Sequence, residues 1–188
     1  MYKLDGPKEM FGFIAHPRTG SRSTRNILCE LGAKKNAGHH QIDEPMSRNI
    51  LQRGGFLACT TRNMFDVLVS WYFNAHFNNK GEVLKPEQAV PKFETYINGL
   101  IDNPPLRWFQ TPVYHYGLSW CYVVVRYENL EADFNAMLDR AGFNPVKLGH
   151  VGKSIGRDPD YRKYYTPELR RQVEERWATD LHLTGCEF

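Results

Sequence analysis

The sequence has no long apolar run and little cysteine, and both absences restrict what the chain can be. No stretch of the 188 residues approaches the roughly 20 apolar residues of a membrane-spanning helix, and the first residues, MYKLDGPKEM, lack the apolar segment of a signal peptide. We therefore expect a soluble, cytoplasmic protein with no membrane partner. The four cysteines are scattered without a C-x-x-C pair, which favours buried free thiols over a disulfide or a metal site.

The chain also lacks a strong charge of either sign. Its 24 basic and 21 acidic residues are interspersed and leave a net charge of +3, which argues against a general nucleic-acid binder. Local basic clusters around a small anion remain compatible with this balance. No linker, repeat or low-complexity segment divides the sequence, so we expect one domain over residues 1–188.

Three times along the chain, a short apolar run precedes a segment with helical periodicity. The apolar runs are Phe11–Ala15, Phe56–Arg62 and Trp120–Tyr127. The first helical segment follows Gly20, and the second begins at Asn63, a residue type that often caps a helix N-terminus. Uninterrupted apolar strands that alternate with helices are typical of a sheet buried on both faces. The sequence therefore predicts an α/β fold with a central, mostly parallel sheet in a three-layer α/β/α arrangement.

The loop HPRTGSRS, residues 16–23, lies between the first predicted strand and its helix. In a strand–loop–helix unit, the N–H groups of the loop and of the helix N-terminus point to one place, which favours an anion. Side-chain donors suited to a phosphate or sulfate come from Arg18, Ser21, Arg22 and Ser23. A polar turn without a ligand would have the same composition, so this loop alone does not decide between the two.

Arg62 ends the second predicted strand, and Ser70 follows eight positions later. In an open α/β sheet, ligands bind beyond the carboxyl ends of the strands, so the loops after the first two strands should face one crevice. Ser70 lies seven residues after Asn63, nearly two helical turns, and so falls on the face of the residue after Arg62. The spacing is compatible with Arg62 and Ser70 facing one anion. It is also compatible with an Arg62 side chain in solvent and a Ser70 that serves only as a small packing residue.

Together, these segments resemble the sulfotransferases that use 3′-phosphoadenosine 5′-phosphosulfate (PAPS). HPRTGSRS resembles their 5′-phosphosulfate loop, and TTRNMFDVLVSWYF resembles their 3′-phosphate segment, where an arginine precedes a serine by eight positions as Arg62 precedes Ser70. VVVRYENLEADFNAMLDRAGF looks like the strand-plus-helix segment of the family, and YYTPELRRQVEERWATDLHLTGCEF is similar to its C-terminal helix. The resemblance covers most of the chain in order, and it implies a P-loop-like sulfotransferase fold.

The resemblance implies an enzyme that transfers a sulfuryl group in line from PAPS to a hydroxyl or amine acceptor, releases 3′-phosphoadenosine 5′-phosphate (PAP) and requires no metal. Arg18 would neutralise charge on the bridging oxygen. The cradle for the 5′-phosphate would be the backbone of Thr19, Gly20, Ser21, Arg22 and Ser23. The acceptor, a small molecule, carbohydrate or peptide, stays open.

Further residues would bind the remainder of the nucleotide by the same resemblance. Arg62 and Ser70 would hold the 3′-phosphate, and Tyr127 would pack near the adenine. Lys153 and Arg157 lie in the basic, glycine-containing segment before the last helix and would close over the 3′-phosphate. A solvated charged loop is the alternative interpretation of these last two residues.

The acceptor needs a general base, and histidine is the usual choice near neutral pH. His39 and His40 lie between the first predicted helix and the second strand. His40 precedes Arg62 by 22 residues, an offset that resembles that of the catalytic histidine in cytosolic-type members of the family. We predict His40 as the catalytic base, with His39 or the carboxylates of Asp43 and Glu44 as alternatives.

Two other function classes remain open from the sequence. A P-loop kinase or NTPase would share the general fold, but no lysine follows Gly20, so the G-x-x-x-x-G-K-[ST] signature is absent. A non-catalytic nucleotide-binding module would keep Arg18, Arg62 and Ser70 and would need no base.

Overall fold

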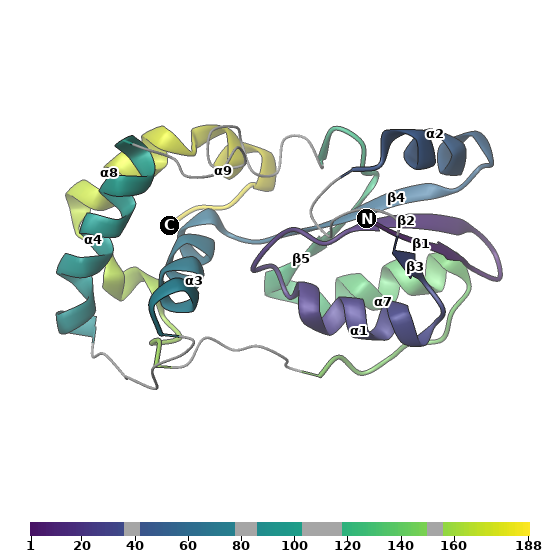
Figure 1. The fold of residues 1–188 in the computed structure, drawn as a ribbon, viewed down its shortest axis with the longest axis horizontal. Helices are drawn as coiled ribbons and strands as arrows, with labels where there is room; N and C mark the ends of the chain where they lie inside the picture. The colour runs from purple at the N-terminus through teal and green to yellow at the C-terminus, as the bar shows by residue number, and fades with distance from the viewer. Residues whose placement is uncertain (36–41, 78–85, 103–117, 150–155) are drawn as a thin grey trace. The chain divides into compact units, whose positions relative to one another are not determined.

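The structure is a computed structural model, and it describes residues 1–35, 42–77, 86–102, 118–149 and 156–188 (Figure 1). Across these ranges, no helix has the length and apolar character needed to cross a lipid bilayer. The chain divides into two compact units, here named the sheet unit and the helical unit. The sheet unit comprises Met1–Arg62 and Tyr116–Gly152, and the helical unit comprises Asn63–His115 and Lys153–Phe188. The single domain expected from the sequence stays a prediction.

The sheet unit contains a five-stranded sheet in the described part of the chain, with the strand order β3-β1-β2-β4-β5. The strands β2, β4 and β5 are parallel to one another, whereas β1 is antiparallel to both β2 and β3. The α/β class is thus confirmed, but the sheet is mixed rather than mostly parallel. The strand bounds are β1 Tyr2–Asp5, β2 Met10–Ile14, β3 Lys34–Lys35, β4 Phe56–Thr61 and β5 Val123–Arg126.

The first strand, β1, explains why the sheet is mixed. Its sequence YKLD alternates buried and more exposed residues, with Tyr2 and Leu4 on the buried side. Four residues connect β1 to β2, and the Gly6 N–H donates to the Glu9 carbonyl over 3.2 Å. So short a connection allows only an antiparallel pair, which places Tyr2 opposite Phe13. No strand was expected before the first apolar run, and the prediction of a mostly parallel sheet was wrong for this reason.

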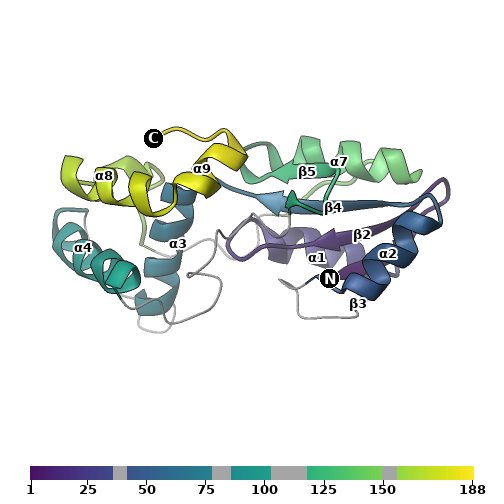
Figure 2. The ribbon, with the colours of Figure 1, turned by 90° about the horizontal axis from the view of Figure 1, so that it is seen from above.

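Helices cover both faces of this sheet (Figure 1). Helices α1 (Ser21–Glu30) and α7 (Leu130–Ala141) pack on one face and share a core with β1, β2, β4 and β5. Helix α2 (Glu44–Gln52) packs on the other face, where it contributes Met46 and Ile50 to a second core. Helix α7 runs beside β5, the strand at the end of the sheet (Figure 2).

The helical unit is built around aromatic side chains. Helix α3 begins at the predicted position, because the Asn63 side chain accepts a hydrogen bond from the Phe65 N–H over 3.0 Å. In the core, the ring centroids of Tyr72 and Phe93 lie 5.4 Å apart, in edge contact. The helices are α3 Met64–Phe77, α4 Pro86–Asp102, α8 Pro167–Arg176 and α9 Ala178–Thr184, with 3₁₀ helices at Tyr127–Asn129 in the sheet unit (η1) and at Tyr161–Tyr164 here (η2).

Candidate anion-binding site

The loop between β2 and α1 contains two residues with left-handed backbone conformation. Arg18 has φ 61° and Gly20 has φ 78°, and Arg18 is the non-glycine residue with positive φ in the described part of the chain. A left-handed conformation is uncommon for a residue with a side chain, and it requires stabilising contacts. The chain therefore turns sharply here and then enters α1 directly.

The N-terminus of α1 is suited to an anion. Among the described residues, no side chain caps this helix at Gly20, and its first turn contains no acidic residue. Instead it contains Ser21 and the exposed Arg22, and Arg18 lies half-buried just before it. A basic residue at the positive end of the helix dipole is unfavourable unless an anion binds there. The loop and the first turn of α1 thus have the chemistry of an anion site.

Threonine hydroxyls hold the loop to the end of β4. The Thr19 hydroxyl donates to the His16 carbonyl over 2.6 Å and is also hydrogen-bonded to the Thr60 hydroxyl. The Thr60 hydroxyl accepts from the His16 N–H over 2.9 Å, and His16 Nδ1 lies 2.6 Å from the Thr60 carbonyl oxygen. These three residues are buried, and buried networks of this kind restrict the backbone to one conformation. The sequence analysis missed Thr60, although polar residues at the end of an apolar strand were the available signal.

Arg62 lies directly after β4 and is only 6% exposed. Its Nη1 donates to the Arg18 carbonyl over 2.7 Å, and its guanidinium lies over the Tyr127 ring, 3.8 Å from the ring centroid. The structure therefore brings together Arg18, Arg62 and Tyr127, which the sequence analysis placed around one ligand. One face of the Tyr127 ring contacts a guanidinium, and its predicted place beside an adenine stays a prediction.

The segment after β5 and the segment after α7 pack against the same loop. A Cβ atom on Gly20 would lie 2.5 Å from Leu130 Cδ2, so a larger residue would have to displace the Leu130 side chain as well as adopt a positive φ. The Ser23 hydroxyl donates to the Gly149 carbonyl over 2.5 Å. The side-chain donor predicted for an anion at Ser23 is thus bound within the protein in this structure.

Two more predicted ligand-binding residues belong to the helical unit. Ser70 is buried in α3 and 2% exposed. Arg157 forms an ion pair with Asp66, in which the side chains are 10% and 14% exposed. Binding of a phosphate by Arg157 would require Asp66 to share or release the guanidinium. Lys153 lies outside the described residues.

The predicted bases are only partly described. His39 and His40 lie outside the described residues. Asp43 caps the N-terminus of α2, where its Oδ1 accepts from the Met46 N–H over 3.0 Å, and Glu44 is the first residue of that helix. A capping carboxylate stabilises the helix start, so Asp43 has a structural role that is independent of catalysis.

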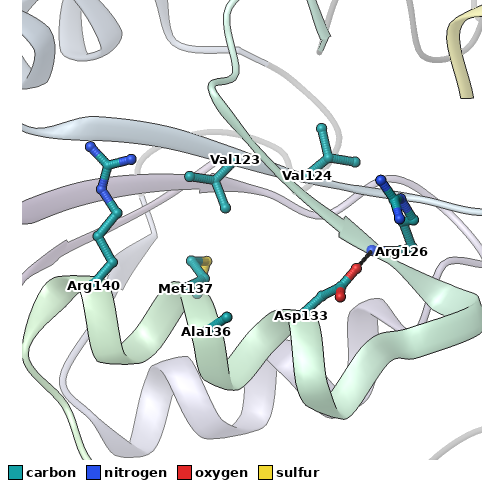
Figure 3. Close-up of a pocket in the computed structure, with 7 residues that line it drawn as sticks. All are labelled: Val123, Val124, Arg126, Asp133, Ala136, Met137 and Arg140. Atoms are coloured by element: carbon teal, nitrogen blue, oxygen red, sulfur yellow. Dashed lines mark hydrogen bonds between the residues drawn. The ribbon is translucent and has the colours of Figure 1, made fainter.

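A pocket of about 240 Å³ lies between β5 and α7, also in the sheet unit (Figure 3). Asp133 accepts from the Arg126 N–H over 3.0 Å and from Asn129 Nδ2 over 2.7 Å, which ties the end of β5 to the start of α7. At the other end, Arg140 pairs with Glu9 over 3.0 Å. Of the described residues that line this pocket, none was predicted to bind the ligand.

Comparison of the chain with protein-family models, with curated proteins and with solved structures found no match. A functional inference therefore depends on the sequence pattern and on the geometry around Arg18, Arg62 and Tyr127.

Proposed function

We propose that this protein is a PAPS-dependent sulfotransferase with a P-loop-like fold. The observation that supports it most is the loop of residues 16–23. Arg18 and Gly20 adopt left-handed conformations immediately before a helix N-terminus that no described side chain caps. Such a turn before a helix N-terminus favours an anion, which supports the resemblance of HPRTGSRS to a 5′-phosphosulfate loop.

In the proposed reaction, bound PAPS supplies the sulfuryl group, and the acceptor and leaving oxygens lie in line. The N–H groups of Thr19–Ser23 hold the 5′-phosphate, and the Arg18 guanidinium stabilises the charge that develops on the bridging oxygen. A sulfuryl group carries less negative charge than a phosphoryl group, so arginine and backbone donors suffice for it. His40 removes the acceptor proton.

The 3′-phosphate is bound by Arg62 and Ser70 in this proposal, with Lys153 and Arg157 closing over it. The guanidinium has five N–H donors in a planar fork that suits a phosphate, and its Nη1 donates to the Arg18 carbonyl. Arg157 would exchange its ion pair with Asp66 for the phosphate. Arg157 therefore contributes less to phosphate binding than an exposed arginine would, because its ion pair with Asp66 must first be broken.

A thermal-shift panel tests the nucleotide. PAP at about 100 times its dissociation constant should stabilise the protein by about 2.7 kcal/mol. AMP at the same concentration should give a smaller shift, because it has no 3′-phosphate for Arg62 and Ser70. Equal shifts with AMP and PAP, or a larger Mg²⁺-dependent shift with ATP, would favour the kinase-like alternative.

Turnover separates an enzyme from a binding module. With PAPS and a panel of hydroxyl and amine acceptors, His40→Ala should reduce turnover by about 10² to 10⁴ with PAP affinity nearly unchanged. Arg18→Ala should lower turnover more than PAP affinity, since the charge it meets grows in the transition state. Binding of PAP by a wild-type protein that turns over no acceptor would favour the non-catalytic module.

A further inference from the structure

We propose that Arg62 and Tyr127 are positioning residues for the anion loop: the Tyr127 ring fixes the Arg62 guanidinium, and Arg62 fixes the peptide between Arg18 and Thr19. The choice of AMP and PAP as ligands in the binding test below rests on the proposed function. The ordering of the loop by Arg62 and Tyr127 does not, because it is a property of the protein without ligand.

The Tyr127 ring determines how Arg62 is oriented. The guanidinium carbon lies 3.8 Å from the ring centroid, within the range of a favourable cation–π contact. Because a guanidinium is planar and its donors have fixed directions, holding its plane also directs Nη1 at its acceptor. A lysine at this position would have neither the planar stack nor the fixed donor direction.

The acceptor is the carbonyl of the left-handed residue Arg18. The hydrogen bond from Arg62 is 2.7 Å long and comes from a charged donor, which makes it roughly twice as strong as a neutral one. In a trans peptide, the C=O of one residue and the N–H of the next point in opposite directions. By drawing the Arg18 carbonyl toward itself, Arg62 therefore turns the Thr19 N–H away, into the group of donors expected to bind the anion.

The contacts on either side of this peptide support the same role. Thr19, the next residue, is held through its hydroxyl by His16 and Thr60. The left-handed φ of Arg18 costs free energy that these two neighbouring contacts offset. Arg62 thus acts on the 5′-phosphate cradle from within the protein, in addition to any contact with the 3′-phosphate.

Amide hydrogen exchange without ligand tests the positioning role. In Arg62→Met and Tyr127→Leu, we expect the Thr24 amide, whose N–H donates to the Gly20 carbonyl of this loop over 3.2 Å, to exchange about tenfold faster or more. The reason is that the charge-assisted hydrogen bond that holds the loop is lost. Tyr127→Phe keeps the ring face and should retain wild-type exchange, and Arg62→Lys should be intermediate. Protection of the β1 amides shows that a variant is folded. Wild-type exchange of the Thr24 amide in folded Arg62→Lys and Tyr127→Leu would overturn the proposal.

Binding of the matched ligands AMP and PAP, which differ only in the 3′-phosphate, tests the consequence. Arg62→Met should weaken AMP about tenfold and PAP at least as much, because the 5′-phosphate cradle that both nucleotides use is then less ordered. Weakening of PAP alone would make Arg62 purely a 3′-phosphate ligand and would overturn the positioning role. If the wild type binds neither nucleotide, the proposed function fails, and the exchange experiment still decides this inference.

Discussion

The sheet unit and the helical unit use their buried polar groups differently. In the sheet unit, two threonine hydroxyls and Arg62 all bind the backbone or side chains of residues 16–19. In the helical unit, aromatic hydroxyls bind the main chain at separate places, as where the Tyr165 hydroxyl donates to the Phe65 carbonyl over 2.9 Å. Bonds that converge on one loop specify its conformation, whereas dispersed bonds stabilise a scaffold. The hydrogen bonds in the sheet unit therefore hold the candidate anion loop in one conformation.

Two largely buried arginines show the same difference. Arg62 donates to the Arg18 carbonyl of the anion loop and stacks on the Tyr127 ring. Arg157 is paired with the carboxylate of Asp66, which neutralises its charge. In the structure Arg157 therefore serves the fold of the helical unit, while the orientation of Arg62 serves the loop.

The largest effect should follow from breaking the ion pair of the helical unit. Asp66→Asn leaves the Arg157 charge without this carboxylate where the side chain is 10% exposed, so we expect the free energy of unfolding to fall by about 3–5 kcal/mol. Chemical denaturation measures the change. The control is Glu174→Gln, which removes the exposed pair of Glu174 with Arg170, 2.7 Å apart, and should cost about 0.5 kcal/mol or less. Equal losses would show that Arg157 is available to a ligand after all.

A slightly smaller effect is expected from filling the space at Gly20. Gly20→Ala combines a left-handed φ with a Cβ 2.5 Å from Leu130 Cδ2, and should cost about 2–4 kcal/mol and abolish PAP binding. Gly32→Ala is the matched control at the other end of α1. Gly32 has φ 89°, but no described atom lies within 4 Å of its Cβ position, so only about 1–2 kcal/mol should be lost, with PAP binding retained. Equal costs would mean that Leu130 does not restrict the loop.

Much of the sheet unit could be predicted from the sequence because its strands are apolar and its helices periodic. The strands β2, β4 and β5 overlap the three predicted apolar runs. Helices α1 and α7 of this unit, and α3 of the helical unit, follow these strands as predicted. The short strands β1 and β3 were not expected, since two to four residues carry almost no periodicity. Helices α2 and α4 were not expected either.

The residues of the candidate site also fall into those that the sequence could predict and those that it could not. Arg18, Gly20 and Arg62 could be predicted from their positions at the carboxyl ends of strands, where ligands bind in such sheets. Thr60 was not predicted, although its place at the end of an apolar strand was a signal, and Leu130 gave no signal. The roles of both depend on contacts with Thr19 and Gly20, which are far away in sequence. The orientation of Arg62 toward a carbonyl is likewise a tertiary property, which spacing alone cannot reveal.

Alkaline pH should act on the aromatic core of the helical unit. Burial raises the pKa of Tyr96 to about 12 and the pKa of Tyr165 well above its ordinary value. The folded state therefore keeps these protons when the unfolded state loses them near pH 10, so stability is full below pH 10 and falls as pH rises toward 12. In Tyr96→Phe, the decrease in the free energy of unfolding at pH 12 should be smaller by about 2 kcal/mol, whereas the stability at pH 7 should change little. Denaturation curves at both pH values measure it, and identical pH dependence in wild type and variant would contradict the burial of the Tyr96 hydroxyl.

The smallest effect on stability, about 1–2 kcal/mol, should come from Thr60→Val, because it removes the acceptor of the His16 N–H and the partner of the Thr19 hydroxyl in a buried network. Thr60→Ser keeps the hydroxyl but loses a methyl group worth about 0.8 kcal/mol, so stability alone separates the two variants poorly. PAP affinity separates them better: Thr60→Val should weaken binding about tenfold, since a loosened Thr19 no longer presents its N–H, whereas Thr60→Ser should bind as the wild type does. If both variants bind PAP normally, the threonine network stabilises β4 without organising the loop. Arg62 would then be the one described contact that supports a preorganised loop in the sheet unit, in contrast to the dispersed bonds of the helical unit.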